Sequence, residues 1–227
     1  MNYRNLLFDV DDTLLDFKAA EDQALKQLFA DTGVSWSQDL KERYQAVNHQ
    51  LWQEFEQGQL SRDEVTGGRF GRFFATLDRK VDSQALDRQY RHYLSQGSQL
   101  LENSKEIVAD LSGKADLYVV TNGVSETQYS RLQAAGLLPY FKGIFVSEDT
   151  GYQKPMKEYF DFVFKRIPDF EQQQTLIIGD SLTSDIKGGQ AAGIDTVWLN
   201  PKAQPLLPQI RPTYEIRHLE ELYQILS

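Results

Sequence analysis

Five short runs of the chain are apolar enough to form buried strands. Each is rich in β-branched or aromatic residues and is followed by polar residues. The runs are residues 5–10, 115–121, 143–147, 175–180 and 195–199. From residue 101 onward, segments with helical periodicity alternate with these runs. This alternation predicts an α/β fold, a Rossmann-like doubly wound parallel sheet with helices on its faces.

Several helix boundaries in this part of the chain carry local signals. Ser125 with Gln128 matches a capping box, and Gly136 matches the stop of the same helix. Pro155 matches the first position of a second helix, and Gly193 matches the stop of a third. We therefore expect helices to begin at Ser125 and Pro155.

Residues 16–98 have helical periodicity and almost no strand signal. Ser61 with Glu64 forms a further capping box, and Gly33 ends the first helix of this region. The sequence thus predicts a core domain of residues 1–15 and 99–227 that is interrupted by a helical domain of residues 16–98. We expect most aromatic residues of the helical domain to pack in its own core, with one or two facing a cleft. They include Trp36, Trp52, Phe55, Phe70, Phe73, Phe74, Tyr90 and Tyr93.

Composition and charge narrow the function classes. The 227-residue chain has a net charge of −9, so it would repel nucleic acid and anionic membrane, and an anionic ligand requires a local site. The chain has no cysteine, which excludes disulfides and thiolate chemistry. No apolar stretch is long enough for a signal peptide or a membrane span, so we expect a cytoplasmic protein with a small-molecule partner. The pattern does not distinguish a monomer from a homodimer.

Polar residues gather where the predicted strands end. The carboxyl ends of parallel strands lie along one edge of a sheet, and ligands bind there. The residues expected at this edge are Asp9, Asp11, Asp12, Thr121, Asn122, Gly123, Lys154, Asp180 and Asp185. Carboxylates in excess of positive charge suit Mg²⁺, while a lysine, a hydroxyl and loop N–H groups suit phosphate. The pattern predicts metal-assisted phosphoryl transfer.

Four segments carry a resemblance to a known family. "DVDDTL", "VVTNG", the lysine of "YQKP" and "GDSLTSD" resemble, in this order, the four motifs of haloacid dehalogenase superfamily phosphatases. The helical insertion after the first motif resembles the C1 cap of subfamily I. The start "LLFDVDDTLLDF", with Asp12 where many relatives have glycine, is similar to that of the pyrimidine 5′-nucleotidases.

The resemblance implies a role for each motif residue. Asp9 would be the nucleophile that forms an aspartyl-phosphate, and Asp11 would be the general acid and base. Asp180, one oxygen of Asp9 and the backbone carbonyl of Asp11 would hold Mg²⁺, with Asp185 nearby or acting through water. Thr121 and Lys154 would bind phosphate oxygens together with loop N–H groups around Asn122. For Asp12 we expect a turn or cap contact and no catalytic role.

Other functions are also compatible with these residues. Sugar-phosphate phosphatases, phosphoglycolate phosphatases and phosphomutases share this machinery, so the substrate could be a phosphorylated metabolite other than a nucleoside monophosphate. A phospho-accepting receiver module also combines acidic residues, a hydroxyl and a lysine around Mg²⁺. Receivers, however, carry the acceptor aspartate on the third strand and lack a helical insertion. A dehalogenase would not need Asp11, because a halide leaves without a proton.

Overall fold

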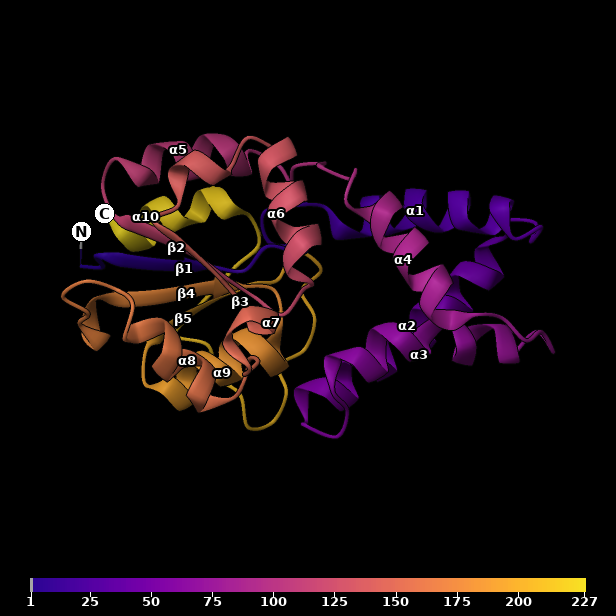
Figure 1. Ribbon diagram of the computed structural model, residues 1–227. Coiled ribbons are helices and arrows are strands. Elements are labelled where there is room, and N and C mark those ends of the chain that lie inside the picture. Colours follow the sequence, from indigo (N-terminus) through magenta and orange to yellow (C-terminus); the bar gives the residue numbers. More distant parts are fainter. Residues whose placement is uncertain (1) are drawn as a thin grey trace. The chain divides into compact units, whose positions relative to one another are not determined.

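The computed structural model describes residues 2–227, and the chain divides into two compact units (Figure 1). Residues 1–17 and 98–227 make up one unit, here called the core unit. Residues 18–97 make up the other, here called the helical unit. The chain therefore leaves the core unit after its first strand and returns to it before residue 100.

The described part of the core unit contains a six-stranded, fully parallel sheet with the order β3-β2-β1-β4-β5-β6. Its strands are β1 (Asn5–Phe8), β2 (Asp116–Thr121), β3 (Gly143–Val146), β4 (Thr175–Gly179), β5 (Asp195–Leu199) and β6 (Tyr214–Ile216). The predicted doubly wound parallel sheet is confirmed, and five strands lie within two residues of their predicted bounds. The sixth strand, β6, was not predicted, since three residues at a sheet edge give no readable period.

Alternate residues of the central strands face opposite layers of helices (Figure 1). Leu6 and Phe8 of β1 pack in a cluster that includes α5 (Ser104–Ser112) and α10 (Leu222–Leu226). Leu7 packs instead with Tyr159 and Phe160 of α8 (Lys157–Phe164). All three β1 side chains are fully buried. Burial on both faces explains why the strand sequences are continuous apolar runs rather than alternating ones.

The helices of the core unit begin and end partly where the sequence predicted. They are α5 (Ser104–Ser112), α6 (Ser125–Ala134), α7 (Ser147–Thr150), α8 (Lys157–Phe164), α9 (Lys187–Ala192) and α10 (Leu222–Leu226), with short 3₁₀ turns at Leu138–Tyr140, Gln172–Gln174 and Leu219–Glu221 and a π turn at Leu182–Ile186. The stops at Gly136 and Gly193 are confirmed, since both glycines have positive φ.

The predicted helix start at Ser125 is confirmed, but its capping box does not form, and the predicted start at Pro155 is two residues early. Ser125 is the first residue of α6 rather than its N-cap, and no capping box forms. The Ser125 hydroxyl instead donates to Asp149 (2.8 Å), and the Gln128 side chain turns toward Asp11 and Thr121. Helix α8 begins at Lys157, two residues after Pro155. At the start of α6, tertiary hydrogen bonds replace the local capping signal.

The helical unit consists of α1 (Phe17–Asp31, from its second residue), α2 (Gln38–Glu56), α3 (Arg62–Ala75) and α4 (Ser83–Leu94). The predicted capping box of Ser61 and Glu64 forms at the start of α3. Most of the aromatic residues pack against one another, for example Tyr44 on Phe70 with ring centroids 5.3 Å apart. Five of the eight named in the sequence are buried, and Trp36, Trp52 and Tyr93 are half-buried.

A buried ion pair also joins two helices of this unit. Arg69 of α3 donates to Asp87 of α4 through Nε (2.8 Å), and both side chains are 4% exposed. Arg91 donates to the other oxygen of Asp87 (2.7 Å). Because each oxygen of the buried carboxylate has a charged partner, the pair fixes the register of α4 against α3.

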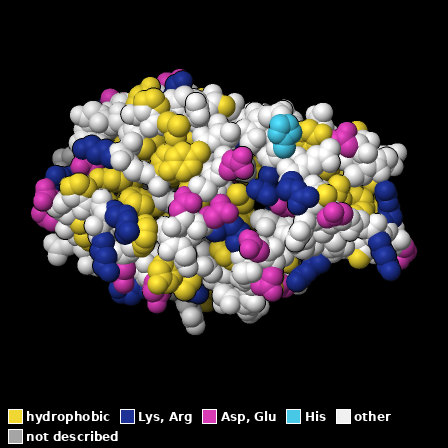
Figure 2. Space-filling model, in the orientation of Figure 1, with side chains coloured by type: hydrophobic (Ala, Val, Ile, Leu, Met, Phe, Trp, Pro, Cys, Tyr) yellow, Lys and Arg dark blue, Asp and Glu magenta, His cyan; other side chains and the backbone are white. Residues whose placement is uncertain are grey.

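Within residues 2–227 there is no helix with the length and apolar character needed to cross a membrane. On the face shown in Figure 2, acidic and basic side chains are interspersed rather than gathered into a patch of one sign. Attraction for an anionic ligand on this face therefore depends on local geometry more than on net charge.

Helix α9 approaches the sheet closely at Gly189. A Cβ atom there would lie 2.6 Å from Ile177 Cγ2 of β4 and 2.7 Å from Thr196 Cγ2 of β5. These distances are shorter than van der Waals contact, so no side chain fits without movement of the helix.

We expect Gly189→Ala to lower the free energy of unfolding by about 1–3 kcal/mol, because the added methyl group overpacks the layer between α9 and the sheet. Gly113→Ala is the matched control, since the nearest atom to its added Cβ is 3.6 Å away. The control should change stability by less than about 0.5 kcal/mol. Urea denaturation measures both, and equal effects would contradict the close packing at Gly189.

Candidate active site

Three neighbouring strands bring the predicted site residues to one edge of the sheet. Asp9 directly follows β1, Thr121 ends β2, and Asp180 directly follows β4. Strands β2, β1 and β4 are adjacent in the sheet. The Asp9 N–H continues the ladder by donating to the Ile178 carbonyl of β4 (2.9 Å), which fixes where the Asp9 side chain begins.

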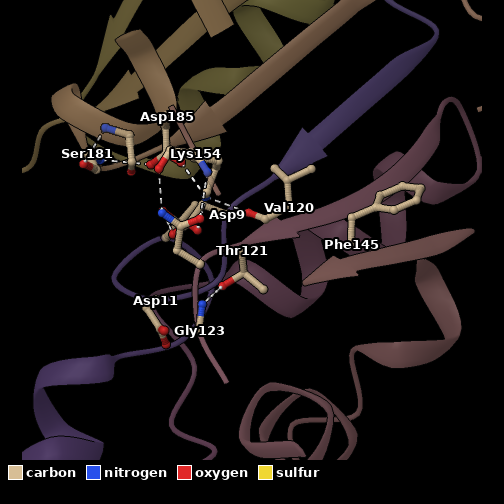
Figure 3. A network of polar contacts seen from close by, with 12 residues as sticks. Asp9, Asp11, Val120, Thr121, Gly123, Phe145, Lys154, Ser181 and Asp185 are labelled. Carbon is tan, nitrogen blue, oxygen red and sulfur yellow. Dashed lines mark hydrogen bonds and ion pairs between the residues drawn. The ribbon is translucent and has the colours of Figure 1, made fainter. Parts of the chain in front are cut away.

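Lys154 is the centre of the site (Figure 3). Its Nζ donates to Asp9 Oδ1 (2.7 Å), to Asp185 Oδ1 (2.6 Å) and to the Val120 carbonyl (2.7 Å). An ammonium has three donors, so this set uses all of them. Lys154 is 1% exposed, which makes it a buried cation held by two buried carboxylates.

The Asn122 side chain holds the backbone of Lys154. Its Nδ2 donates to the Lys154 carbonyl (2.9 Å), and its Oδ1 accepts from the Lys154 N–H (2.9 Å). This reciprocal pair ties the loop after β2 to the segment before α8. The Asn122 side chain therefore positions Lys154.

Burial and crowding shift the ionisation of this group. Burial raises the pKa of Asp9 to about 7, the charge of Lys154 opposes this shift, and Asp185 and Asp11 add to it. The pKa of Lys154 is raised despite its burial, because Asp185 and Asp9 stabilise its charge. The single positive charge of Lys154 thus does not balance the carboxylates of Asp9 and Asp185, and the group keeps an excess of negative charge.

A divalent cation would correct that excess. Asp9, Asp180 and Asp185 each offer an oxygen, and these oxygens lie within 4.8 Å of one another. The Asp180 backbone is fixed by Trp198, whose Nε1 donates to the Asp180 carbonyl (2.8 Å). Three hard oxygens in a cluster with surplus negative charge fit Mg²⁺.

Asp185 is packed more tightly than the other two carboxylates. Its Oδ2 accepts from the Ser181 N–H (3.1 Å), and its Oδ1 accepts from Lys154. A Cβ atom at Gly179 would lie 2.2 Å from Asp185 Oδ2, so only glycine leaves room for this side chain. Because both its oxygens already have protein donors, Asp185 is better suited to orient the cluster than to bind an ion directly.

Asp11 belongs to a second group of contacts, which the sequence did not predict. Its Oδ2 accepts from Gln128 Nε2 (2.7 Å), and its Oδ1 accepts from Arg131 Nη1. Gln128 Nε2 also donates to Thr121 Oγ1 (3.1 Å). The three-residue spacing of Gln128 and Arg131 places both on one face of α6, which is the signal that could have pointed to them.

Asp12 has a conformational role. Its φ of 56° lies in the left-handed region, and its N–H donates to the Leu15 carbonyl (2.9 Å). Aspartate enters this region more readily than most residues, which explains why it can stand where glycine is common. The expected turn contact is thus present.

Comparisons with known proteins agree with this geometry. Residues 6–199 match the family model described as haloacid dehalogenase-like hydrolase. The chain is 55% identical to the HAD-hydrolase YfnB of Bacillus subtilis, over 99% of this chain and 96% of YfnB. It is 41% identical to the pyrimidine 5′-nucleotidase PynA of Streptococcus pneumoniae, over 100% of this chain and 96% of PynA.

Two further comparisons also span the chain. The pyrimidine 5′-nucleotidase YjjG of Escherichia coli is 30% identical over 100% of this chain and 99% of its own length. A crystal structure of YfnB, described as bound to magnesium, superposes with a TM-score of 0.95 and covers 99% of each chain. The family model, the relatives and the shared fold lead to one assignment: the chain belongs to the haloacid dehalogenase-like hydrolases, in their phosphatase group.

Proposed function

We propose that this phosphatase is a Mg²⁺-dependent pyrimidine 5′-nucleotidase that works through an aspartyl-phosphate on Asp9. The observation that supports it most strongly is the buried Lys154 between Asp9 and Asp185, with Asp180 close enough to complete an oxygen cluster. Such a cluster can hold a metal and a phosphoryl group side by side.

Asp9 is suited to attack phosphorus. Lys154 holds Oδ1, whereas the Thr13 hydroxyl reaches Oδ2 only at 3.5 Å, the long limit of a hydrogen bond. We assign Oδ2 as the nucleophilic oxygen. Its bond to phosphorus forms as the bond to the leaving oxygen breaks.

Asp11 supplies and then removes a proton. In the first step it gives its proton to the leaving alkoxide, so that a neutral nucleoside departs. In the second step it accepts a proton from the water that attacks phosphorus, and the bond to Asp9 breaks to release inorganic phosphate. The side chain is 29% exposed, so it remains accessible to a reacting molecule.

Thr121 and Lys154 are the proposed phosphate ligands of the chain, and Lys154 would exchange one of its three protein acceptors for a phosphate oxygen. The Thr121 hydroxyl accepts from the Gly123 N–H (3.2 Å) and from Gln128, so its own proton is left to donate to a phosphate oxygen. Lys154 offsets the charge of the nucleophile, and N–H groups of the loop at Asn122 extend the binding surface.

Asp180, one oxygen of Asp9 and the backbone carbonyl of Asp11 would hold the metal, with Asp185 orienting the cluster. When bound, Mg²⁺ would neutralise charge on the phosphoryl oxygens. Asp9 is buried beside Asp185 and Asp11, which together raise its pKa, and this crowding of carboxylates is the property of the chain that favours such an ion.

Substrate choice has to come from residues beyond the phosphoryl-binding cluster, because that cluster is suited to any phosphomonoester. Two full-length relatives are named pyrimidine 5′-nucleotidases, which supports a pyrimidine nucleoside monophosphate as substrate. The half-buried Trp36, Trp52 and Tyr93 of the helical unit are side chains able to stack on a base.

The two aspartates should differ in how their loss depends on the leaving group. We expect Asp9→Asn to lower kcat for every substrate by about 10⁴-fold or more, because the covalent step is lost. Asp11→Asn should lower kcat/KM for UMP by about 10²–10⁴-fold but for p-nitrophenyl phosphate by less than about tenfold, since an activated leaving group needs little protonation. Steady-state phosphate release measures this, and equal losses for the two substrates in Asp11→Asn would contradict its role as acid.

Metal removal should abolish activity. We expect EDTA to stop turnover and Mg²⁺ to restore it, and we expect Asp180→Ala to weaken Mg²⁺ binding by about tenfold or more in calorimetric titrations. Because the raised pKa of Asp9 leaves a proton to be displaced at low pH, Mg²⁺ affinity should fall by about tenfold per unit below pH 7.

The matched control is Asp110→Ala, which removes a half-exposed carboxylate of α5 that pairs with Lys114 (2.6 Å). This variant should keep full Mg²⁺ affinity and activity. Turnover in EDTA, or an affinity that is the same at pH 6 and pH 8, would contradict the assigned metal site.

The substrate should be a pyrimidine nucleotide. At matched low concentrations we expect kcat/KM for UMP and dTMP to exceed that for purine monophosphates, sugar phosphates and phosphoglycolate. A tenfold advantage of a sugar phosphate or phosphoglycolate, about 1.4 kcal/mol in transition-state binding, would replace the nucleotidase assignment and leave the phosphatase assignment intact. Transfer of phosphate between sugar positions would instead identify a phosphomutase.

A further inference from the structure

The carboxylate of Asp11 is held by two donors from α6. Gln128 donates to Oδ2 (2.7 Å) and Arg131 donates to Oδ1, so each oxygen has its own partner. Gln128 and Arg131 are each 1% exposed. In Figure 3 the Asp11 carboxylate points away from the group formed by Asp9, Lys154 and Asp185. None of the steps above uses Gln128 or Arg131 directly.

The residues around Asp11 leave room for the contacts with Gln128 and Arg131 and support them. A Cβ atom at Gly123 would lie 2.3 Å from Gln128 Nε2, so the glycine of the β2 loop leaves the space through which Gln128 reaches Asp11. The Arg131 guanidinium lies over the Phe17 ring, with Cζ 5.6 Å from the centroid. Its Nη1 is also 3.5 Å from Gln128 Oε1. The Asp11 carboxylate is thus confined to one position by Gly123, the Gln128 amide, the Arg131 guanidinium and the Phe17 ring.

A general acid and base needs a fixed position more than most groups do. Proton transfer to a leaving oxygen requires the carboxyl group to lie within hydrogen-bond reach in the correct orientation. A side chain on a loop has several rotamers, and a displacement of about 1 Å can cost about 10²-fold in rate. Two buried donors at fixed spacing on one helix restrict those rotamers, while the 29% exposure of Asp11 leaves it open to the substrate.

We propose that Gln128 and Arg131 are positioning residues for Asp11, which orient its carboxylate for both proton transfers and link it through Gln128 to the phosphate ligand Thr121. This proposal rests on the acid and base role of Asp11 in the proposed function. Gln128 and Arg131 do not touch the reacting atoms. Arg131 acts only on the steps that Asp11 serves, whereas Gln128 also donates to Thr121 and so affects phosphate binding as well.

The contrasting explanation is that the two residues only anchor α6 to the loop after β1. An anchor would lower activity with every substrate alike, through loss of folded protein or of the whole site. A positioning residue affects only the substrates whose leaving groups need a proton. Leaving-group dependence therefore separates the two explanations.

The experiment compares Gln128→Met, Arg131→Met and Arg131→Lys with the parent enzyme. Methionine keeps the length of the side chain and removes its donors. We expect Arg131→Met to lower kcat/KM for UMP by about tenfold or more and for p-nitrophenyl phosphate by less than about threefold. Gln128→Met also removes a donor to Thr121, so it should lower kcat/KM for both substrates, with the larger loss for UMP. Arg131→Lys, which keeps the charge, should recover part of the loss with UMP. Gln133→Met, on the exposed side of the same helix, is the control and should match the parent enzyme.

The two Arg131 substitutions are then made in the Asp11→Asn background. If they act through Asp11, they should cause no further loss with UMP there. A loss of the same size in both backgrounds, or equal losses with the two substrates, would overturn the positioning role. Thermal melting shows whether Arg131→Met folds, and Arg131→Lys carries the same test with the charge kept.

Failure of the proposed function gives a different result. If Asp11→Asn alone loses UMP and p-nitrophenyl phosphate activity equally, its acid role is wrong, and the positioning role is overturned with it. If Asp11→Asn shows the expected leaving-group dependence and the α6 variants do not, only the positioning role is overturned.

Discussion

The site depends on one buried charge, the Lys154 ammonium between the carboxylates of Asp9 and Asp185. Without it, two buried carboxylates would face each other with no cation, which is a costly arrangement. With it, Asp9 is held at the end of β1, but burial, together with the charges of Asp185 and Asp11, still raises the pKa of Asp9 to about 7. The lysine therefore stabilises the cluster and leaves a need for a further cation. In the proposed function, a metal ion would supply that further cation.

The parts around Lys154 show how a parallel sheet builds such a site. Strands β2, β1 and β4 end side by side and present Thr121, Asp9 and Asp180 at one edge. Glycines then set the remaining distances: Gly179 leaves room for Asp185, and Gly123 leaves room for Gln128. Asn122 fixes the backbone of Lys154 with a reciprocal pair of hydrogen bonds. The site is thus positioned by backbone geometry and by side chains that do no chemistry themselves.

The two aspartates of the first loop lie in different environments although only one residue separates them. Asp9 contacts the buried lysine, whereas Asp11 contacts the amide and guanidinium of α6. One carboxylate is thereby fixed as part of a charge cluster and the other as a separate, partly exposed group. This division is what a nucleophile and a proton donor require of neighbouring residues.

The sequence by itself determined five of the six strands described, the parallel sheet and the edge at which the acidic residues gather. These features follow from local apolar periods, from the inability of parallel strands to connect without crossovers, and from the shared direction of their ends. The tertiary structure alone decided the partners of those residues. Ser125 and Gln128 match a capping box in the sequence. In the folded chain, however, the Gln128 side chain donates a hydrogen bond to Asp11, 117 residues away. The Arg131 contact to Asp11 and the use of Asn122 to hold Lys154 likewise join residues that are distant in the chain. The physical reason is that a side chain near a helix start can bond either to a local backbone group or to a distant carboxylate. Only the folded chain brings the stronger, charged partner within reach.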